Sequence, residues 1–224
     1  MTSKGGPHQF SFQPNDPAGE PALAVETDRL RETLRRQAPD EFARRAGAAF
    51  TPQDQGRGTL VVELLGKPFV LDFPELIARS EPDVPAPLPI QALLMYYLTT
   101  SDGSAPVGEW VSFADLPGGR IYAQAFQGYS GNLLTKAFNL DIQSFRRACA
   151  SAGGRPVEFA DAAFAFNALP HIPLLVTYWL GEDEFPSASK VLFDPTAVRH
   201  LPIDVCAILG GMLASRILKE HNID

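Results

Sequence analysis

The stretch LPHIPLLVTYWLGEDEFPSASKVLFDP, residues 169–195, decides the fold because two apolar runs in it flank three consecutive acids. The first run, Ile172–Leu180, is too short to cross a bilayer, which requires about 20 apolar residues. Its valine, threonine, tyrosine and tryptophan favour a β-strand that is covered on both faces. The second run, Lys190–Phe193, follows after a short loop. The two runs therefore predict an antiparallel hairpin that carries Glu182, Asp183 and Glu184 at its tip.

The length of that loop separates the acids at the tip from the next acid in the chain. A hairpin across Gly181–Ser189 would place Leu180 near Lys190. Asp194 then lies about four residues, or roughly 14 Å, further along the strand. It precedes a proline and a threonine, the pattern of a helix N-cap with proline at the first helical position. We therefore expect Asp194 to be structural, as a cap that asparagine could replace.

The rest of the chain shows several further helical and strand patterns. Leu23, Leu30 and Leu34 form the apolar stripe of an amphipathic helix. Expected helices cover residues 21–37, 39–47, 90–101, 120–138, 141–152 and 203–220. Expected strands cover 60–65 and 67–73, as a hairpin around Gly66, and then 109–113, 156–159 and 163–167. Residues 81–89 are rich in proline and predict a stiff, extended connector.

The order of these elements determines the fold class. Connections between the C-terminal strands are too short to hold crossover helices, so neighbouring strands should be antiparallel. The sequence predicts an α+β fold in which a largely antiparallel sheet packs against helices. We expect one domain over residues 20–224, whose N-terminal part, 20–47, is helical. Residues 1–19 hold one lysine and no apolar run, which predicts a disordered leader instead of a signal peptide.

Charge and cysteine content exclude several classes of function. The net charge is −7, and the arginines between Arg29 and Arg45 are interleaved with acids, so we expect neither a nucleic-acid partner nor a membrane surface. Cys149 and Cys206 stand far apart, without a CxxC motif, which excludes a self-contained iron–sulfur or zinc-ribbon site. Both are expected to be buried, reduced thiols of a cytoplasmic protein.

The acidic tip has two interpretations that the residues leave open. Glu182, Asp183 and Glu184 could bind a hard divalent cation or supply a general acid and a general base. They could equally form a solvated loop. We assign no metal ligands and no catalytic residue from this pattern.

A second group of functional candidates lies between Asp102 and Tyr122. Glu109 and Trp110 stand at the start of an expected strand, and two glycines precede Arg120 at the start of an expected helix. Glycines at a helix N-terminus can leave backbone N–H groups open to an anion, although a turn that orients the helix needs the same residues. Neither GxxxxGK[ST] nor GxGxxG is present.

Histidines and serines give no catalytic pattern. Neither HExxH nor GxSxG occurs in the chain. His171 and His200 are therefore each expected to be structural. Ser112 and Ser130 have no base that the sequence assigns to them.

Three segments together resemble an uncharacterised prokaryotic family, domain of unknown function 3786. They are GEWVSFADLPGGRIY (residues 108–122), LPHIPLLVTYWLGEDEFPSASKVLFD (169–194) and HLPIDVCAILG (200–210), within a similarity over residues 88–213. The resemblance implies no established activity. Some relatives carry an added cysteine-rich iron–sulfur module, which implies a role beside corrinoid or redox metabolism in anaerobes. This chain lacks that module, so a redox partner would be a separate protein.

From these features we predict a cytoplasmic protein that binds a small-molecule ligand or a protein partner. Its site would lie between the two aromatic and charged segments, with Arg120 meeting an anion. The remaining predicted site residues are Glu109, Trp110, Tyr122, Trp179, Asp183, Glu184 and Phe185. Two alternatives stay open: a hydrolytic or divalent-metal enzyme that uses the acidic tip, and a scaffold protein that docks a basic partner. Both tryptophans could instead be core residues, and neither a cofactor nor an oligomeric state is assigned.

Overall fold

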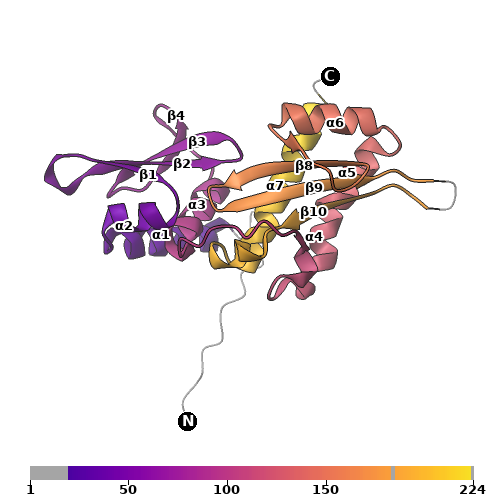
Figure 1. Ribbon diagram of the computed structural model, residues 1–224. Coiled ribbons are helices and arrows are strands. Elements are labelled where there is room, and N and C mark those ends of the chain that lie inside the picture. Colours follow the sequence, from indigo (N-terminus) through magenta and orange to yellow (C-terminus); the bar gives the residue numbers. More distant parts are fainter. Residues whose placement is uncertain (1–19, 183–184, 223–224) are drawn as a thin grey trace, which may run out of the picture.

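The N-terminal half of the chain forms an antiparallel sheet with helices on one face (Figure 1). The structure is a computed structural model that describes residues 20–182 and 185–222; the predicted leader, the acids Asp183 and Glu184, and the last two residues lie outside this part. The helices are α1 (Glu20–Arg35), α2 (Pro39–Arg45) and α3 (Leu88–Thr100). The strands, in spatial order, are β1 (Ala49–Pro52), β2 (Gly58–Leu64), β3 (Lys67–Phe73), β4 (Ala78–Glu81) and β5 (Val84–Pro85).

Helix α1 confirms the predicted amphipathic stripe. Leu23, Thr27, Leu30 and Leu34 are its buried residues, and they recur every three or four positions as one helical face requires. The arginines of the same helix pair with acids one turn away, as Arg29 does with Glu26 at 2.6 Å. Arg29 and Arg35 therefore lie on a solvated helix face, whereas the Arg31 side chain is largely buried and also donates to the carbonyl of Leu76.

The β2–β3 hairpin confirms the strands predicted around Gly66. Leu65 and Gly66 have φ angles of 50° and 71°, so both turn residues adopt the left-handed conformation of a two-residue hairpin turn. Along β2, the side chains of Leu60, Val62 and Leu64 are buried against the helices.

The connector predicted at residues 81–89 is partly wrong, because it contains a strand. Strand β5 pairs with β4, and the N–H of Ala86 donates to the carbonyl of Ala78 at 2.8 Å. Pro85 is tolerated because β5 is the edge strand of its sheet, where one side of the backbone needs no partner.

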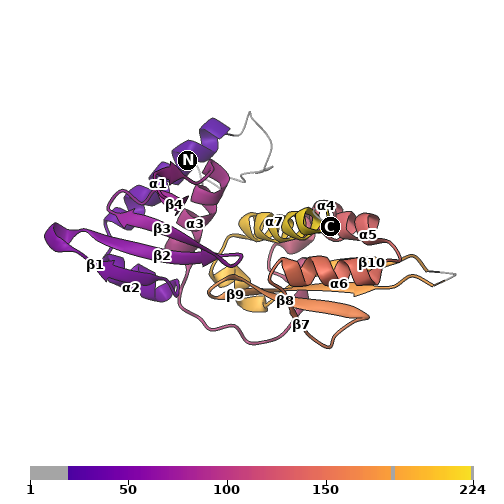
Figure 2. The same ribbon diagram turned by 90° about the horizontal axis from the view of Figure 1, so that it is seen from above.

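The C-terminal half contains a second antiparallel sheet, where the sequence predicted one sheet for the whole chain. Helices cover one face of this sheet, and its other face lies away from them (Figure 2). Its strands, in spatial order, are β6 (Val111–Ser112), β10 (Ala188–Phe193), β9 (Ile172–Trp179), β8 (Ala162–Leu169) and β7 (Arg155–Pro156). The helices are α4 (Ala123–Tyr129), α5 (Gly131–Phe138), α6 (Ile142–Ser151) and α7 (Ile203–His221), with short 3-10 turns η2 (Phe113–Asp115), η3 (Gly119–Ile121) and η4 (Pro195–Arg199).

Strand β9 is covered on both faces, as its composition predicted. Leu174, Val176 and Tyr178 belong to the main core beneath the helices. Leu175 points to the other face, into a small cluster that Trp110 covers. The main core also includes buried residues of α1, β2 and α7, so both sheets share one hydrophobic core. The predicted α+β class is confirmed.

The single helix predicted over residues 120–138 is wrong, since the chain breaks at Ser130. The backbone there has φ −123° and ψ −93°, and the helix restarts as α5 against β10. From α4, Gln127 also reaches β10, where its side-chain amide donates to the carbonyl of Ser189 at 2.9 Å.

In α7, the adjacent glycines Gly210 and Gly211 face aromatic rings of α4. A Cβ on Gly210 would lie 2.7 Å from Phe126, and one on Gly211 would lie 3.0 Å from Tyr129. These glycines allow α4 to pack closely on α7. None of the described helices, α7 included, is long and apolar enough to cross a membrane.

Candidate functional site

Trp110 lies at the start of β6, on the face of the C-terminal sheet that the helices leave uncovered. Its ring is partly exposed and packs on a cluster whose buried members are Ala163, Leu175 and Leu192. Glu109, the residue before it, is exposed. Trp110 therefore has a packing role, and its exposed edge remains available to a ligand.

Trp179 ends strand β9, where its indole faces a cation. The ammonium group of Lys190 lies 6.0 Å from the centre of the ring, within the range of a cation–π contact. Because Trp179 is paired with Ala188, it stands near the start of β10, close to the hairpin tip.

The described parts of the two predicted segments lie at opposite ends of the same strands. Val111 pairs with Phe193, which pairs with Leu174, whereas Trp179 is five residues further along β9. That separation is about 16 Å along the strand. Asp183 and Glu184, which would complete the predicted pocket, lie outside the described residues, so a shared site stays a prediction.

Gly118 and Gly119 form a turn in which close packing requires a glycine. A Cβ on Gly119 would overlap the carbonyl oxygen of Phe113, so only glycine fits this close approach. The turn leads into η3, where Arg120 is exposed. Tyr122 follows it and packs against the main core.

The end of the C-terminal sheet that carries Trp179 also gathers exposed apolar side chains, which we call the distal patch. It consists of Phe159, Leu180 and Phe185, which are 50%, 37% and 71% exposed. The carboxylate of Asp161 accepts the backbone N–H of Leu180 at 2.8 Å, so the turn that holds Phe159 is tied to the hairpin. Exposed acids lie beside these residues in the chain: Glu158, Asp161 and Glu182.

Asp194 is confirmed as the N-cap of a short helix, and it does more than the sequence predicted. One of its carboxylate oxygens accepts the N–H and the hydroxyl of Thr196, at 3.0 and 2.6 Å. The other accepts the N–H of Gly108 at 2.8 Å. Burial by itself raises the pKa of a carboxyl group, but these bonds from Thr196 and Gly108 hold the pKa of Asp194 below its ordinary value.

A pair of histidines lies where the two halves meet, and no pattern in the sequence predicted it. The rings of His171 and His200 are stacked with centroids 5.1 Å apart. The Nδ1 atom of His200 shares a hydrogen bond of 2.8 Å with the Ser101 hydroxyl. In both rings Nε2 is buried and has no hydrogen-bond partner among the described residues. Burial and the neighbouring His171 ring lower the pKa of His200.

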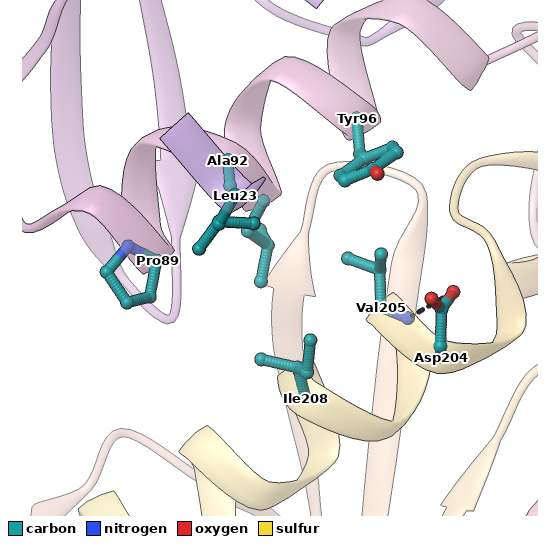
Figure 3. Close-up of a pocket in the computed structure, with 8 residues that line it drawn as sticks. Leu23, Pro89, Ala92, Tyr96, Asp204, Val205 and Ile208 are labelled. Carbon is teal, nitrogen blue, oxygen red and sulfur yellow. Dashed lines mark hydrogen bonds between the residues drawn. The ribbon is translucent and has the colours of Figure 1, made fainter. Parts of the chain in front are cut away.

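A crevice between α1, α3 and α7 is drawn in Figure 3. The cavity measures about 20 Å³, room for little more than one water molecule. Asp204 stands at one side of it, beneath the ring of Tyr96, and burial raises the pKa of the Asp204 carboxyl. The other lining residues are apolar: Leu23, Pro89, Ala92, Leu93, Val205 and Ile208. This crevice shares no residue with the predicted site.

Cysteines and metal-binding side chains add no further centre in the described part of the chain. Cys149 and Cys206 are buried as free thiols, and burial raises the pKa of both. Within residues 20–182 and 185–222, no three His, Cys, Asp or Glu side chains are grouped closely enough to hold a metal ion.

Comparison with known proteins identifies a family but no function. No curated protein and no solved structure matches the chain. A family model described as a domain of unknown function, DUF3786, matches residues 38–216. That match includes both sheets, the histidine pair and the distal patch. The chain therefore belongs to the DUF3786 family.

Proposed function

We propose that this chain is a partner-binding protein, whose distal patch docks on a basic and partly apolar surface of another protein. The observation that carries the proposal is the exposure of Phe185, 71%, on a hairpin that extends beyond the helices (Figures 1 and 2). Larger exposed apolar patches with a polar rim mark protein-interaction sites.

The hairpin offers this anchor on a braced scaffold. Glu182 and Phe185 exchange two backbone hydrogen bonds, of 2.9 and 3.0 Å. Nearer the sheet, the N–H of Gly181 donates to the Ser187 hydroxyl at 2.9 Å. A scaffold held in this way loses little conformational entropy when it binds, which favours affinity.

Charge determines the kind of partner that this surface fits. Glu158, Asp161 and Glu182 are exposed beside the apolar side chains, and the chain has a net charge of −7. A basic surface would be attracted to this rim, and its association would slow as salt screens the charges. We place this encounter in the cytoplasm, where the buried thiols of Cys149 and Cys206 would stay reduced.

The family resemblance supports a role as an accessory of corrinoid or redox metabolism. In relatives that carry an iron–sulfur module, that module is part of the same chain. These 224 residues hold only two cysteines, which stand 57 positions apart and cannot bind such a cluster by themselves. A docking surface would allow them to act beside a redox group.

Photo-crosslinking tests the proposal directly. With p-benzoylphenylalanine in place of Phe185, we expect one major adduct with a second protein in cells that express the chain. The same probe at Ile121, which is 75% exposed but lies outside the distal patch, serves as the matched control. Glu182→Lys, added to the Phe185 probe, should weaken the adduct because it reverses a charge of the rim.

Three results would contradict the proposal. Equal adducts from both probe positions would show that the distal patch is not selective. Adducts only between copies of this chain would replace the partner with self-association. An adduct that persists unchanged with Glu182→Lys would remove the basic character that we assign to the partner.

A further inference from the structure

The histidine pair occupies the junction between the two halves of the molecule. His171 belongs to the β8–β9 turn of the C-terminal sheet, and a Cβ on Gly47, just after α2, would lie 3.0 Å from its Nε2 atom. His200 follows η4 and is bonded to Ser101, which follows α3. Each imidazole therefore contacts a segment from the N-terminal half.

Tyr97 joins the same two halves beside the imidazoles. Its hydroxyl donates to the carbonyl of Ala46 at 2.8 Å and accepts the backbone N–H of His171 at 3.1 Å. Its ring centre lies 6.4 Å from that of His200. Any displacement of His171 would therefore disturb the bond that links β9 to α2 and α3.

We propose that His171 and His200 form an acid-sensitive clamp, which holds the two sheets together while the His200 ring is neutral and loosens when that ring takes up a proton.

The geometry favours the neutral state of the His200 ring. Each buried Nε2 atom lacks an acceptor, so a proton placed there would be a charge without a hydrogen-bond partner. A second proton would add a like charge on the stacked ring, whose centroid is 5.1 Å away.

The groups around the pair do not cancel this effect. From the segment after α3, Asp102 favours a proton on His200, but its carboxylate is already paired with Arg199 at 2.8 Å. Arg199, on η4, disfavours the proton, as does His171. On α2, the guanidinium of Arg45 donates to the side-chain oxygen of Gln37 at 2.8 Å. From α3, burial raises the pKa of Tyr97 to about 12, so that residue stays neutral.

The direction of the pH effect follows from these contacts. Burial and His171 lower the pKa of His200 in the folded protein, while an unfolded histidine titrates near 6.5. The clamp should therefore be fully closed above about pH 6.5 and should weaken as the pH falls below that value. For one linked proton, the opening equilibrium rises by up to about tenfold for each pH unit.

Amide hydrogen exchange at the junction tests the clamp, with protection factors corrected for the intrinsic effect of pH. The reporters are the N–H groups of Leu65 and His171, which are bonded to Ala168 and Tyr97. Between pH 7.5 and 5.0, we expect both protection factors to fall by tenfold or more in the unaltered protein. The protection factor of an amide inside α1, such as that of Leu30, should fall less.

Neutral variants provide the control. In His200→Asn the amide can keep the bond to Ser101 but cannot take up a proton, so the fall at the junction should largely disappear. His221→Asn removes a histidine that lies against Phe138, outside the junction, and should leave the fall unchanged. If His200→Asn fails to fold, proton NMR titration of the imidazole Cε1–H signals in the unaltered protein replaces it. Junction protection that does not change with pH, an equal fall in His200→Asn, or a His200 pKa at or above 6.5 would overturn the proposal.

Discussion

Asp194 accepts a hydrogen bond from the backbone of Gly108, although 86 residues separate them, with 2.8 Å between the carboxylate oxygen and the nitrogen. This bond fastens the segment that joins the two halves to the start of η4. Asp102 and Arg199 fasten the same segment a second time, through an ion pair of 2.8 Å.

Because Asp194 caps η4 and also bonds to Gly108, replacing it should destabilise the protein more than replacing a simple N-cap. A simple N-cap tolerates asparagine, but Asp194 uses both oxygens as acceptors. In Asp194→Asn the NH₂ group must face the N–H of Gly108 or of Thr196, and we expect a loss of about 1–3 kcal/mol in the free energy of unfolding. Urea denaturation measures it. Asp141→Asn is the matched control: Asp141 also uses both oxygens, but its second bond comes from the Ser144 hydroxyl, which can accept from the new NH₂ group, so almost nothing should be lost. Equal losses would contradict the assignment.

Adjacent glycines of α7 should respond in opposite ways to alanine. A helical Gly→Ala change ordinarily stabilises by about 1 kcal/mol. At Gly210 the new methyl group would lie 2.7 Å from the buried ring of Phe126, so we expect a net loss of about 1–3 kcal/mol from overpacking. At Gly211 it meets Tyr129, which is 40% exposed and can move aside. Thermal unfolding of both variants checks the contrast, and a stabilised Gly210→Ala would refute the packing argument.

The bridging hydroxyl of Tyr97 should contribute to stability at neutral pH. Tyr97→Phe keeps the ring but leaves the Ala46 carbonyl and the His171 N–H without their partner. A loss of about 1–3 kcal/mol is expected for these buried groups. Tyr129→Phe is a suitable control, because that residue is partly exposed. Calorimetry at pH 7.5 distinguishes the two, and similar melting temperatures would argue against the bridge.

Alanine substitutions of the two tryptophans should differ in their effect on the free energy of unfolding. Trp110→Ala uncovers the cluster of Ala163, Leu175 and Leu192, and it should cost about 3 kcal/mol or more. Trp179 is partly buried too but belongs to neither core cluster, and its contact with Lys190 is worth about 0.5–1 kcal/mol, so Trp179→Ala should cost less. Guanidinium titrations followed by circular dichroism measure both. If Trp179→Ala lowers the free energy of unfolding as much as Trp110→Ala does, Trp179 is a core residue.

Much of the fold could be predicted because local patterns control it. The stripe of α1, the Asp141 cap and the Gly66 turn each depend on residues within one or two helical turns or on one turn type. The register of the β9–β10 hairpin was harder to predict. Leu180 was expected beside Lys190, whereas Lys190 pairs with Thr177, because β10 begins earlier than its apolar run suggests. Strand pairing extends over polar residues wherever backbone groups can bond, which composition does not reveal.

The parts that could not be predicted depend on contacts between distant segments. The break at Ser130 has a local signal, because a Ser-Gly pair favours a turn, but apolar residues that continue on the far side of it favour one long helix instead. His171 and His200 gave no motif, and their stacking requires the β8–β9 turn and η4 to meet. The bond between Asp194 and Gly108 has the same origin. A histidine whose ring nitrogen lacks a hydrogen-bond partner can be recognised only after the tertiary structure is known.

The contact between Leu65 and Ala168 has a consequence for how this fold can evolve. Strand β7 pairs with β8 only at Phe164 and Ala165, and the N–H of Leu65 donates to the carbonyl of Ala168, near the other end of β8. A β-strand edge without such a cover is a template for aggregation. Gene fission between the halves would therefore release a C-terminal fragment prone to form fibrils, so selection for solubility should keep the two halves in one reading frame.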